Sequence, residues 1–225
     1  MRVTFDNLGE AADLERGMWP AGKPLGHDRS VTTALPRLLD ELDAHRLTAT
    51  FFVEGINCEM YPDALLEIAA RGHELGVHGW RHEPWGQLRA DRERELLTRS
   101  DRAFRELGLR PSGFRPPGGG VTAQTGPLLR ELGYTYWSRA APAAPASGLD
   151  DLTFEWRLVD AYWLMETFAD QRRDSGDPGE PMAPSVLGEH LARARPEDVL
   201  VLHPFLMLDE AWWEQVRGLL AMLGR

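Results

Sequence analysis

The sequence predicts an α/β fold, and a (β/α) barrel is favoured over an open sheet. Strand-like and helix-like stretches alternate along the chain, and six or seven such pairs fit into its 225 residues. This alternation implies parallel strands that are joined by right-handed crossovers. A chain of this length commonly forms one barrel-type unit. We therefore expect residues 1–225 to form a single domain.

Each element is read from its pattern of apolar residues. Strands are expected over residues 2–6, 48–53, 74–78, 113–115, 134–137, 156–162 and 199–202. Apolar residues at three- and four-residue spacing predict helices over 31–43, 62–70, 89–107, 123–132, 185–194 and 210–223. Gly72, Gly108 and Gly133 each follow such a helix, where a left-handed cap favours glycine.

Two further stretches have the composition of loops. Residues 140–150 are rich in Ala and Pro, which predicts a surface loop. Residues 171–184 are charged and rich in Gly and Pro, which predicts either a lid or a disordered excursion.

The composition argues against several kinds of partner. A formal net charge of -10 disfavours nucleic acid and anionic membranes, since both would repel the chain. No stretch approaches the roughly 20 apolar residues that span a bilayer. The single Cys58 excludes an internal disulfide and a Cys-based zinc cluster. The N-terminus runs directly into a strand, so we expect no signal peptide and a cytoplasmic protein, either monomeric or a homo-oligomer.

Polar residues suited to amide hydrolysis lie at or beside the ends of five predicted strands. In a βα barrel, the C-terminal ends of the strands face one shared pocket. Any one of these residues could simply cap a helix or a loop. Together they predict a single site, which contains Asp6, His78, Arg115, Asp160 and His203.

His78 and His82 lie four residues apart, across a strand end and the turn after it. This spacing can direct two imidazoles at one metal, and neutral histidine is a good zinc ligand. Two surface histidines are the alternative reading of the spacing alone. Trp80, between them, is expected to pack against the pocket wall and to contact the substrate.

The motifs resemble those of the polysaccharide deacetylase superfamily, which contains chitin and peptidoglycan N-deacetylases and an allantoinase-related branch. The similarity spans residues 3–204 and rests on VTFDN (3–7), HGWRH (78–82), FRPPG (114–118), VD (159–160) and LHP (202–204). It implies a distorted seven-stranded (β/α) barrel. Segment 156–162, which carries Asp160, matches its family motif only loosely.

The resemblance implies Asp6 as the catalytic base, with a divalent metal, expected to be zinc, on His78, His82 and residue 7. The family has Asp at this last position, whereas this chain has Asn7. An amide oxygen is neutral and binds zinc more weakly than a carboxylate. Three alternatives stay open: Asn7 is a ligand, Glu10 takes its place, or the site works without a metal.

The remaining motifs imply the other catalytic roles. Arg115 would hold Asp6 ionised and oriented, and His203 would act as the general acid with Asp160 as its partner. The loop with Pro117 and Gly118 would bind the substrate and turn backbone N–H groups toward a developing oxyanion.

These residues predict a hydrolase of a non-peptide C–N bond. The expected reaction is N-deacetylation of an N-acylated sugar or small metabolite, so the partner is a small-molecule or oligosaccharide substrate. A metal-independent amidase or cyclic-amide hydrolase of the allantoinase-related type is one alternative. A non-catalytic ligand-binding homologue is another, although such a protein would need neither a base nor an acid.

Overall fold

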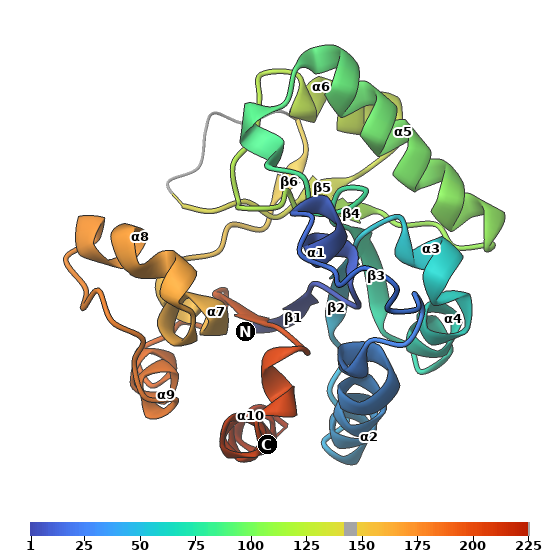
Figure 1. Ribbon diagram of the computed structural model, residues 1–225. Coiled ribbons are helices and arrows are strands. Elements are labelled where there is room, and N and C mark those ends of the chain that lie inside the picture. Colours follow the sequence, from blue (N-terminus) through green and yellow to red (C-terminus); the bar gives the residue numbers. More distant parts are fainter. Residues whose placement is uncertain (142–147, 225) are drawn as a thin grey trace.

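Seven parallel strands form a curled half-barrel in the computed structural model, which describes residues 1–141 and 148–224 (Figure 1). The strands lie in the order β6-β5-β4-β3-β2-β1-β7. They are β1 (Arg2–Asp6), β2 (Thr50–Val53), β3 (Glu74–Val77), β4 (Gly113–Phe114), β5 (Tyr136–Trp137), β6 (Asp150–Asp151) and β7 (Val199–Leu202). The predicted seven-stranded fold is therefore confirmed. Between β7 and β6 an isolated bridge from Val159 to Val201 extends the sheet without closing the barrel.

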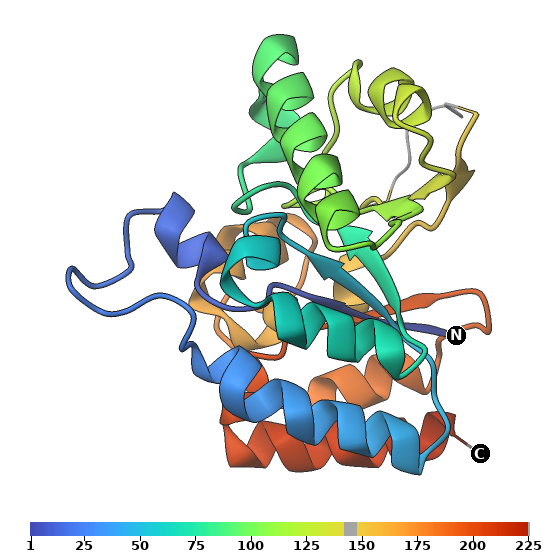
Figure 2. The ribbon, with the colours of Figure 1, turned by 90° about the vertical axis from the view of Figure 1, so that its right-hand side faces the viewer.

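The central strands are buried along their whole length because helices cover the outside of the sheet. All four residues of β2 and of β7 are buried, so both read as continuous apolar runs rather than alternating ones. Helix α2 (Leu35–Ala44) buries Leu35, Leu38, Leu39 and Leu42, the stripe expected at helical spacing. Figure 2 shows α2 and the C-terminal helix α10 (Glu210–Leu223) running along the same side of the molecule.

The long predicted helices are confirmed. They are α2, preceded by a π-helical turn at Ser30–Ala34, α4 (Pro62–Ala70), α5 (Ala90–Glu106), α6 (Thr125–Glu131), α9 (Ser185–Leu191) and α10. Gly72, Gly108 and Gly133 have φ of 83°, 79° and 87°, the left-handed caps expected from the sequence. Nowhere in residues 1–141 and 148–224 is a helix both long enough and apolar enough to span a bilayer.

Several short helical elements have no counterpart in the predicted set. They are α1 (Ala11–Glu15), α3 (Asn57–Met60), α7 (Asp160–Leu164) and α8 (Ala169–Asp174), with 3-10 turns at Trp85–Gln87, Trp156–Leu158, Glu166–Phe168 and Leu206–Leu208. Elements of three to six residues are too short to show a helical period, which explains why the pattern did not reveal them.

The predicted strand over 156–162 is wrong. Its first part forms a 3-10 turn, and α7 begins at Asp160. A short apolar run does not distinguish a strand from a buried helical turn. The sixth strand is instead β6, which begins at the last residue of the loop predicted over 140–150. Both β6 side chains are exposed acids, so no apolar pattern marks this strand, and residues 142–147 of the predicted loop lie outside the described residues.

The stretch 171–184 begins inside α8 and is folded against α7 (Figure 1). Arg172, which is fully buried, holds this stretch in place. The guanidinium donates hydrogen bonds to four backbone carbonyl groups, those of Tyr162, Met165, Pro178 and Gly179. Asp177 fastens the same segment by accepting hydrogen bonds from Arg157 and from the Tyr162 hydroxyl. The alternative of a disordered excursion is therefore wrong.

We expect Arg172→Met to lower the free energy of unfolding by about 3 kcal/mol or more, because each buried carbonyl left unpaired costs roughly 1–3 kcal/mol. Urea denaturation measures the change, and hydrogen exchange should localise it to residues 162–184. Arg173→Met is the matched control, since Arg173 is exposed and Asp170 is the one described residue with which its side chain pairs. A change within about 0.5 kcal/mol for both variants would show that Arg172 does not hold this stretch.

Candidate active site

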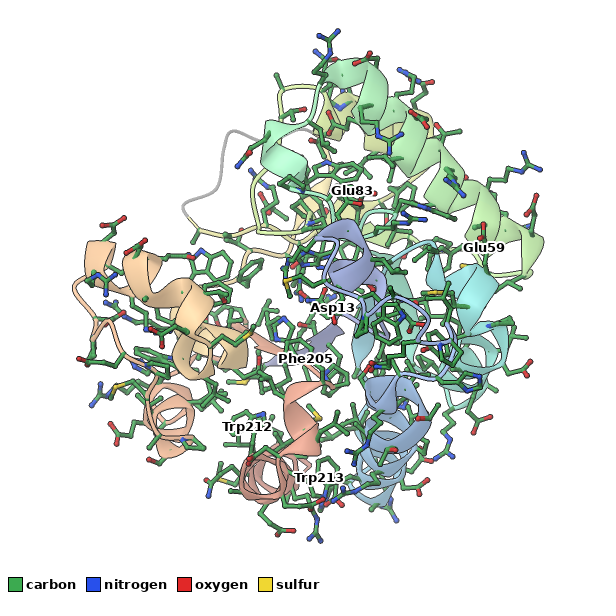
Figure 3. The ribbon with its side chains drawn as sticks, in the orientation of Figure 1. Asp13, Glu59, Glu83, Phe205, Trp212 and Trp213 are labelled. Carbon is green, nitrogen blue, oxygen red and sulfur yellow. The ribbon has the colours of Figure 1, made fainter. Side chains whose placement is uncertain are left out.

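A pocket of about 490 Å³ lies at the C-terminal ends of the strands. This volume falls within the range of roughly 300–1,000 Å³ that small-molecule sites occupy. Figure 3 shows Asp13 and Phe205, which lie on its rim, near the middle of the molecule, while Trp212 and Trp213 lie lower, where α10 packs. The structure brings seven residues of the predicted site into the pocket lining: Asp6, Asn7, His78, His82, Arg115, Gly118 and His203.

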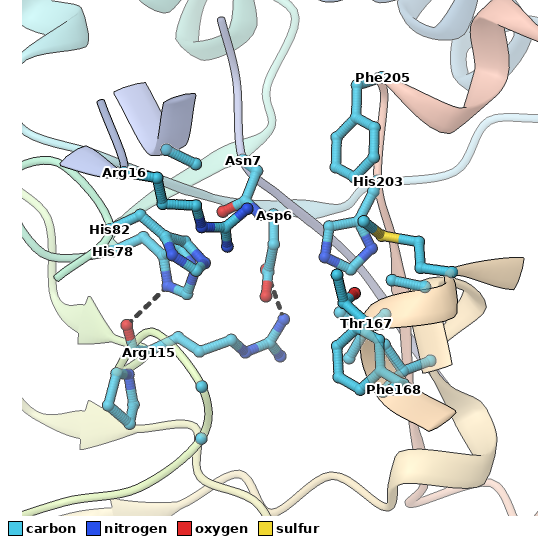
Figure 4. A pocket seen from close by; sticks show the side chains of 18 of the residues that line it. Asp6, Asn7, Arg16, His78, His82, Arg115, Thr167, Phe168, His203 and Phe205 are labelled. Atoms are coloured by element: carbon cyan, nitrogen blue, oxygen red, sulfur yellow. Dashed lines mark hydrogen bonds and ion pairs between the residues drawn. The ribbon is translucent and has the colours of Figure 1, made fainter. Parts of the chain in front are cut away.

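Asp6 and Arg115 form a buried ion pair. Asp6 ends β1, and its Oδ1 lies 2.6 Å from Nη1 of Arg115, which follows β4. Arg115 is only 1% exposed and also donates to the hydroxyl groups of Thr4 and Ser138. Because three acceptors share one guanidinium, the Asp6 carboxylate is held in a single orientation at the floor of the pocket (Figure 4).

His203 and Asp160 form a second buried pair, across the pocket from His78 (Figure 4). The Asp160 carboxylate accepts from the backbone N–H of His203 at 2.9 Å and lies 2.5 Å from its ring Nδ1. Burial alone would lower the pKa of His203, but the charge of Asp160 and its hydrogen bond raise the pKa above the ordinary value. The Asp160 contact leaves Nε2 of His203 as the nitrogen that can exchange a proton within the pocket.

His78 and His82 are neutral imidazoles. Burial lowers the pKa of each to about 3. Their ring centroids lie 5.1 Å apart, with the planes nearly perpendicular. The backbone carbonyl of Arg115 accepts a hydrogen bond from Nδ1 of His78 at 2.8 Å, which leaves the Nε2 lone pair free. The two rings are therefore available as metal ligands over the neutral pH range.

Asn7 supplies the third donor that a metal would need. Its Oδ1 is buried and has no hydrogen-bond partner among the described residues, which an amide oxygen rarely tolerates. The residue has φ of 60°, a conformation that Asn accepts more readily than most residues. No three His, Cys, Asp or Glu side chains in the described ranges gather into a metal-binding set. The donors present thus fit a divalent metal held by two imidazoles and one amide oxygen.

Glu10 does not take the place of the missing carboxylate. It is 1% exposed, and its Oε1 accepts from the backbone N–H of Gly26 at 2.7 Å. The Tyr61 hydroxyl donates to its other oxygen. Glu10 is absent from the pocket lining, so this alternative is excluded and Asn7 stays the residue at the third position.

One of the three predicted substrate contacts lies in the pocket lining and two do not. Gly118 lines the pocket, whereas Pro117 does not and its neighbour Pro116 does. Trp80 lies outside the lining, is 2% exposed, and packs under the guanidinium of Arg99 at 3.7 Å. It cannot touch a ligand in this pocket, so its predicted substrate contact is wrong. A buried ring and a ligand-stacking ring look the same in a sequence, which is the reason for this error.

Two buried acids that sequence reasoning missed hold the loops of the site. Glu83 accepts from the backbone N–H groups of Trp80 and Arg81, and so fixes the turn that carries His82. Glu54, just after β2, accepts from the backbone N–H of Leu8 at 3.4 Å and from Asn57 at 3.1 Å. Glu83 directly follows His82 in the sequence, which was the one available signal.

Glu54 makes stability depend on pH. Burial, with help from the charge of Asp6, raises its pKa to about 8, far above the ordinary value near 4.3. Between these two values the unfolded chain loses this proton and the folded chain keeps it. The folded state then binds more protons, so stability falls as the pH rises from 5 to 8.

Between pH 5 and pH 8 this group should lower the free energy of unfolding by on the order of 4 kcal/mol. We expect Glu54→Gln to remove most of that decrease, because the amide keeps the acceptor and carries no charge. Urea unfolding at pH 5 and pH 8 measures it. Glu59→Gln, at an exposed position, should change stability by less than about 0.5 kcal/mol at either pH. Parallel pH profiles for wild type and Glu54→Gln would contradict the assignment.

About half of the chain matches known proteins in sequence. The family model described as polysaccharide deacetylase matches residues 24–137. A peptidoglycan-N-acetylglucosamine deacetylase of Bacillus cereus is 33% identical over 87 residues, covering 38% of this chain and 32% of that protein. A peptidoglycan deacetylase of Helicobacter pylori is 30% identical over 125 residues, covering 55% and 39%. The chain thus spans 32% and 39% of the length of these two curated relatives.

Among solved structures, a putative polysaccharide deacetylase from Mycobacterium smegmatis is similar over almost the whole chain. It superimposes with a TM-score of 0.78 at 27% identity, covering 99% of this chain and 82% of that one. The family match covers the four strands β2 to β5, with His78, His82 and Arg115 of the pocket lining, and the structural match extends to the rest of the chain. The chain belongs to the polysaccharide deacetylase family.

Proposed function

We propose that this protein hydrolyses a non-peptide C–N bond and removes the acetyl group from an N-acetylated sugar. The observation that carries the proposal is the pair of buried couples on facing sides of one pocket, Asp6 with Arg115 and His203 with Asp160. One couple presents a carboxylate, and the other presents an imidazole whose pKa is raised. A base and an acid placed this way suit the two proton transfers of amide hydrolysis.

Asp6 and His203 would divide the chemistry between them. Asp6 accepts a proton from a water molecule whose oxygen attacks the acyl carbon, and a tetrahedral intermediate forms. Protonated His203 then donates its Nε2 proton to the amide nitrogen, and the C–N bond breaks. The products are acetate and a free amine. Arg115 orients the Asp6 carboxyl group through its hydrogen bond, and Asp160 orients His203 and favours its imidazolium form.

A metal would be held by His78 Nε2, by the ring of His82 and by the Asn7 Oδ1 atom that lacks a partner. When bound, a divalent ion polarises a carbonyl group and makes a water molecule more acidic. All three donors are neutral, as they are in three-histidine zinc sites. No ligand would therefore offset the charge of the ion, and the site would bind the metal more weakly than one with a carboxylate ligand.

The loop after β4 has one free donor for a developing oxyanion. Pro116 and Pro117 have no N–H group, and the N–H of Gly119 bonds to the carbonyl of Pro116 at 2.9 Å. The backbone N–H of Gly118 makes no hydrogen bond to any described residue, and Gly118 lines the pocket. Of the backbone N–H groups predicted to face an oxyanion, that of Gly118 is therefore the candidate.

The expected substrate is a carbohydrate because relatives in this family act on N-acetylated glycans, as their names state. The pocket supports this choice, since the adjoining aromatic rings of Phe154, Trp156 and Phe168 form one aromatic wall in its lining. Sugar rings stack on such aromatic faces.

We expect Asn7→Asp to tighten zinc binding at least about tenfold, because the change adds a charged ligand, and even outer-shell partners alter metal affinity by roughly 10–100-fold. Asp tolerates the left-handed backbone of this position nearly as well as Asn. Calorimetric titration of the metal-free protein measures the affinity. An unchanged affinity would show that residue 7 is not a ligand.

A substrate panel tests the proposed function. Metal-loaded protein is incubated with N-acetylglucosamine oligosaccharides, with N-acetylated amino acids and with the cyclic amide allantoin, and free amine and acetate are measured. The proposal expects acetate and amine in equal amounts from the acetylated sugars. Turnover of allantoin alone would replace it with the cyclic-amide alternative, and tight sugar binding without turnover would favour the ligand-binding one.

A further inference from the structure

Arg16 places an uncommitted positive charge in the pocket. It directly follows α1 and lines the pocket with Asn7 and His82 (Figure 4). Its guanidinium forms no ion pair or hydrogen bond with any described residue. Arg115, the other arginine of the lining, is committed to Asp6. A cation that points into a ligand pocket without a partner is available to an anionic ligand.

The carboxylates around Arg16 do not neutralise it. Asp6 forms an ion pair with Arg115, and Oδ1 of Asp28 accepts a hydrogen bond from the backbone N–H of Ser30 at 2.8 Å. Asp13 also lines the pocket and lies three residues before Arg16, yet the two side chains form no ion pair. Asp13 and Asp28 are thus the carboxylates of the described lining that have no cationic partner, and neither forms an ion pair with Arg16.

Asn7 also makes this side of the pocket more favourable for an anion. An amide there leaves out a negative charge that a carboxylate would place beside the ligand. The neutral rings of His78 and His82 add none. The side of the pocket near α1 is therefore suited to an anion, whereas the ring of Phe168 lies across the pocket from Arg16 (Figure 4).

We infer that Arg16 selects substrates that carry a carboxylate in addition to the N-acetyl group, an inference that rests on the proposed function. The planar guanidinium can bind a carboxylate through two parallel hydrogen bonds, which gives geometric selectivity as well as charge attraction. The substrate then spans the pocket. Its carboxylate lies on the α1 side, its ring lies against the aromatic wall, and its acetyl group lies between Asp6 and His203.

Matched pairs of acids and esters test this inference. N-acetylmuramic acid, with its carboxylate on O3, and 2-acetamido-2-deoxyglucuronic acid, with its carboxylate at C6, are each compared with their methyl esters. For at least one pair, wild type should prefer the acid by about 10–100-fold in kcat/KM, the range of a charge-assisted pair. Arg16→Gln should remove this preference, mainly through KM, and leave the ester within about twofold.

Two further variants sharpen the result. Arg29→Gln removes an exposed arginine that follows Asp28 and lies outside the pocket lining, so it should leave the preference unchanged. Asp13→Asn removes a competing carboxylate and should strengthen the preference for the acid. Equal rates for acid and ester in wild type, or equal losses on both in Arg16→Gln, would overturn the inference.

A binding measurement separates this inference from the proposed function. Calorimetric titration of the acids into Asp6→Asn protein, with and without Arg16→Gln, reports affinity in the absence of turnover. Weakening by about tenfold or more on removal of Arg16 would support the carboxylate site even if no substrate were hydrolysed. Equal affinities would reject the site even if neutral acetylated sugars were deacetylated.

Discussion

We expect Asp6→Asn to lower kcat for amide hydrolysis by about 10²–10⁴-fold, the range that a positioned acid or base contributes. The substitution keeps the size of the side chain and its Oδ1 acceptor for Arg115, but it removes the group that takes the proton from water. Initial rates of acetate release under saturating substrate measure the loss. KM should change little, because the base acts in the transition state.

The same substitution should also destabilise the protein, because it leaves the Arg115 charge buried without a counterion. Losing one partner of a buried pair costs roughly 3–5 kcal/mol. Thr4→Val is the matched control, since Thr4 also accepts from Arg115 at 2.9 Å but cannot act as a base. It should lose stability and keep kcat within about tenfold. If Thr4→Val lost as much activity as Asp6→Asn, the role of Asp6 would be structural.

His203→Ala should separate substrates by their leaving group. We expect kcat/KM for an N-acetyl amide to fall by about 10²–10⁴-fold, because an amine leaves only after protonation. An activated aryl acetate needs no such proton and should lose less than about tenfold. Parallel assays of both substrates on wild type and variant measure the difference. Equal losses would assign His203 to substrate positioning instead of general-acid catalysis.

The pH profile tests the partner of His203. Asp160 raises the pKa of this imidazole through its charge and its hydrogen bond. The acid form is lost as the pH rises through that raised pKa, so activity should fall on the alkaline side. In Asp160→Asn this alkaline limb should move to lower pH, since the larger of the two negative charges that oppose the effect of burial is then removed and only that of Asp6 is left. An unmoved limb would mean that another group titrates there.

Much of the site was predictable because its residues lie at the ends of strands. Asp6, His78 and His203 each follow a buried apolar run, and parallel strands bring such ends to one rim whatever the details of packing. The predicted pairing of Asp160 with His203 is found in the structure, but the strand predicted to carry Asp160 is not. Asp160 begins α7 rather than ending a strand, and the bridge from Val159 to β7 carries it to His203.

The remaining features depend on contacts that no local pattern encodes. Arg172 orders the stretch 171–184 through carbonyl groups on both sides of it in sequence, and its neighbour Arg173 is an ordinary exposed arginine. Arg16 matters because α1 is placed at the pocket, and α1 is too short to be seen as a helix. Trp80 was misplaced since burial decides between packing and ligand contact, and burial is a property of the fold.

Acetate and free amine released from N-acetylated sugars by purified, metal-loaded protein test the central claim most directly. Wild type is compared with the Asp6→Asn, His203→Ala double variant, and folding is confirmed by circular dichroism. The account predicts one acetate per amine from wild type, and a rate at least about 10²-fold lower from the double variant. Equal release by both proteins, or none by folded wild type, would contradict it.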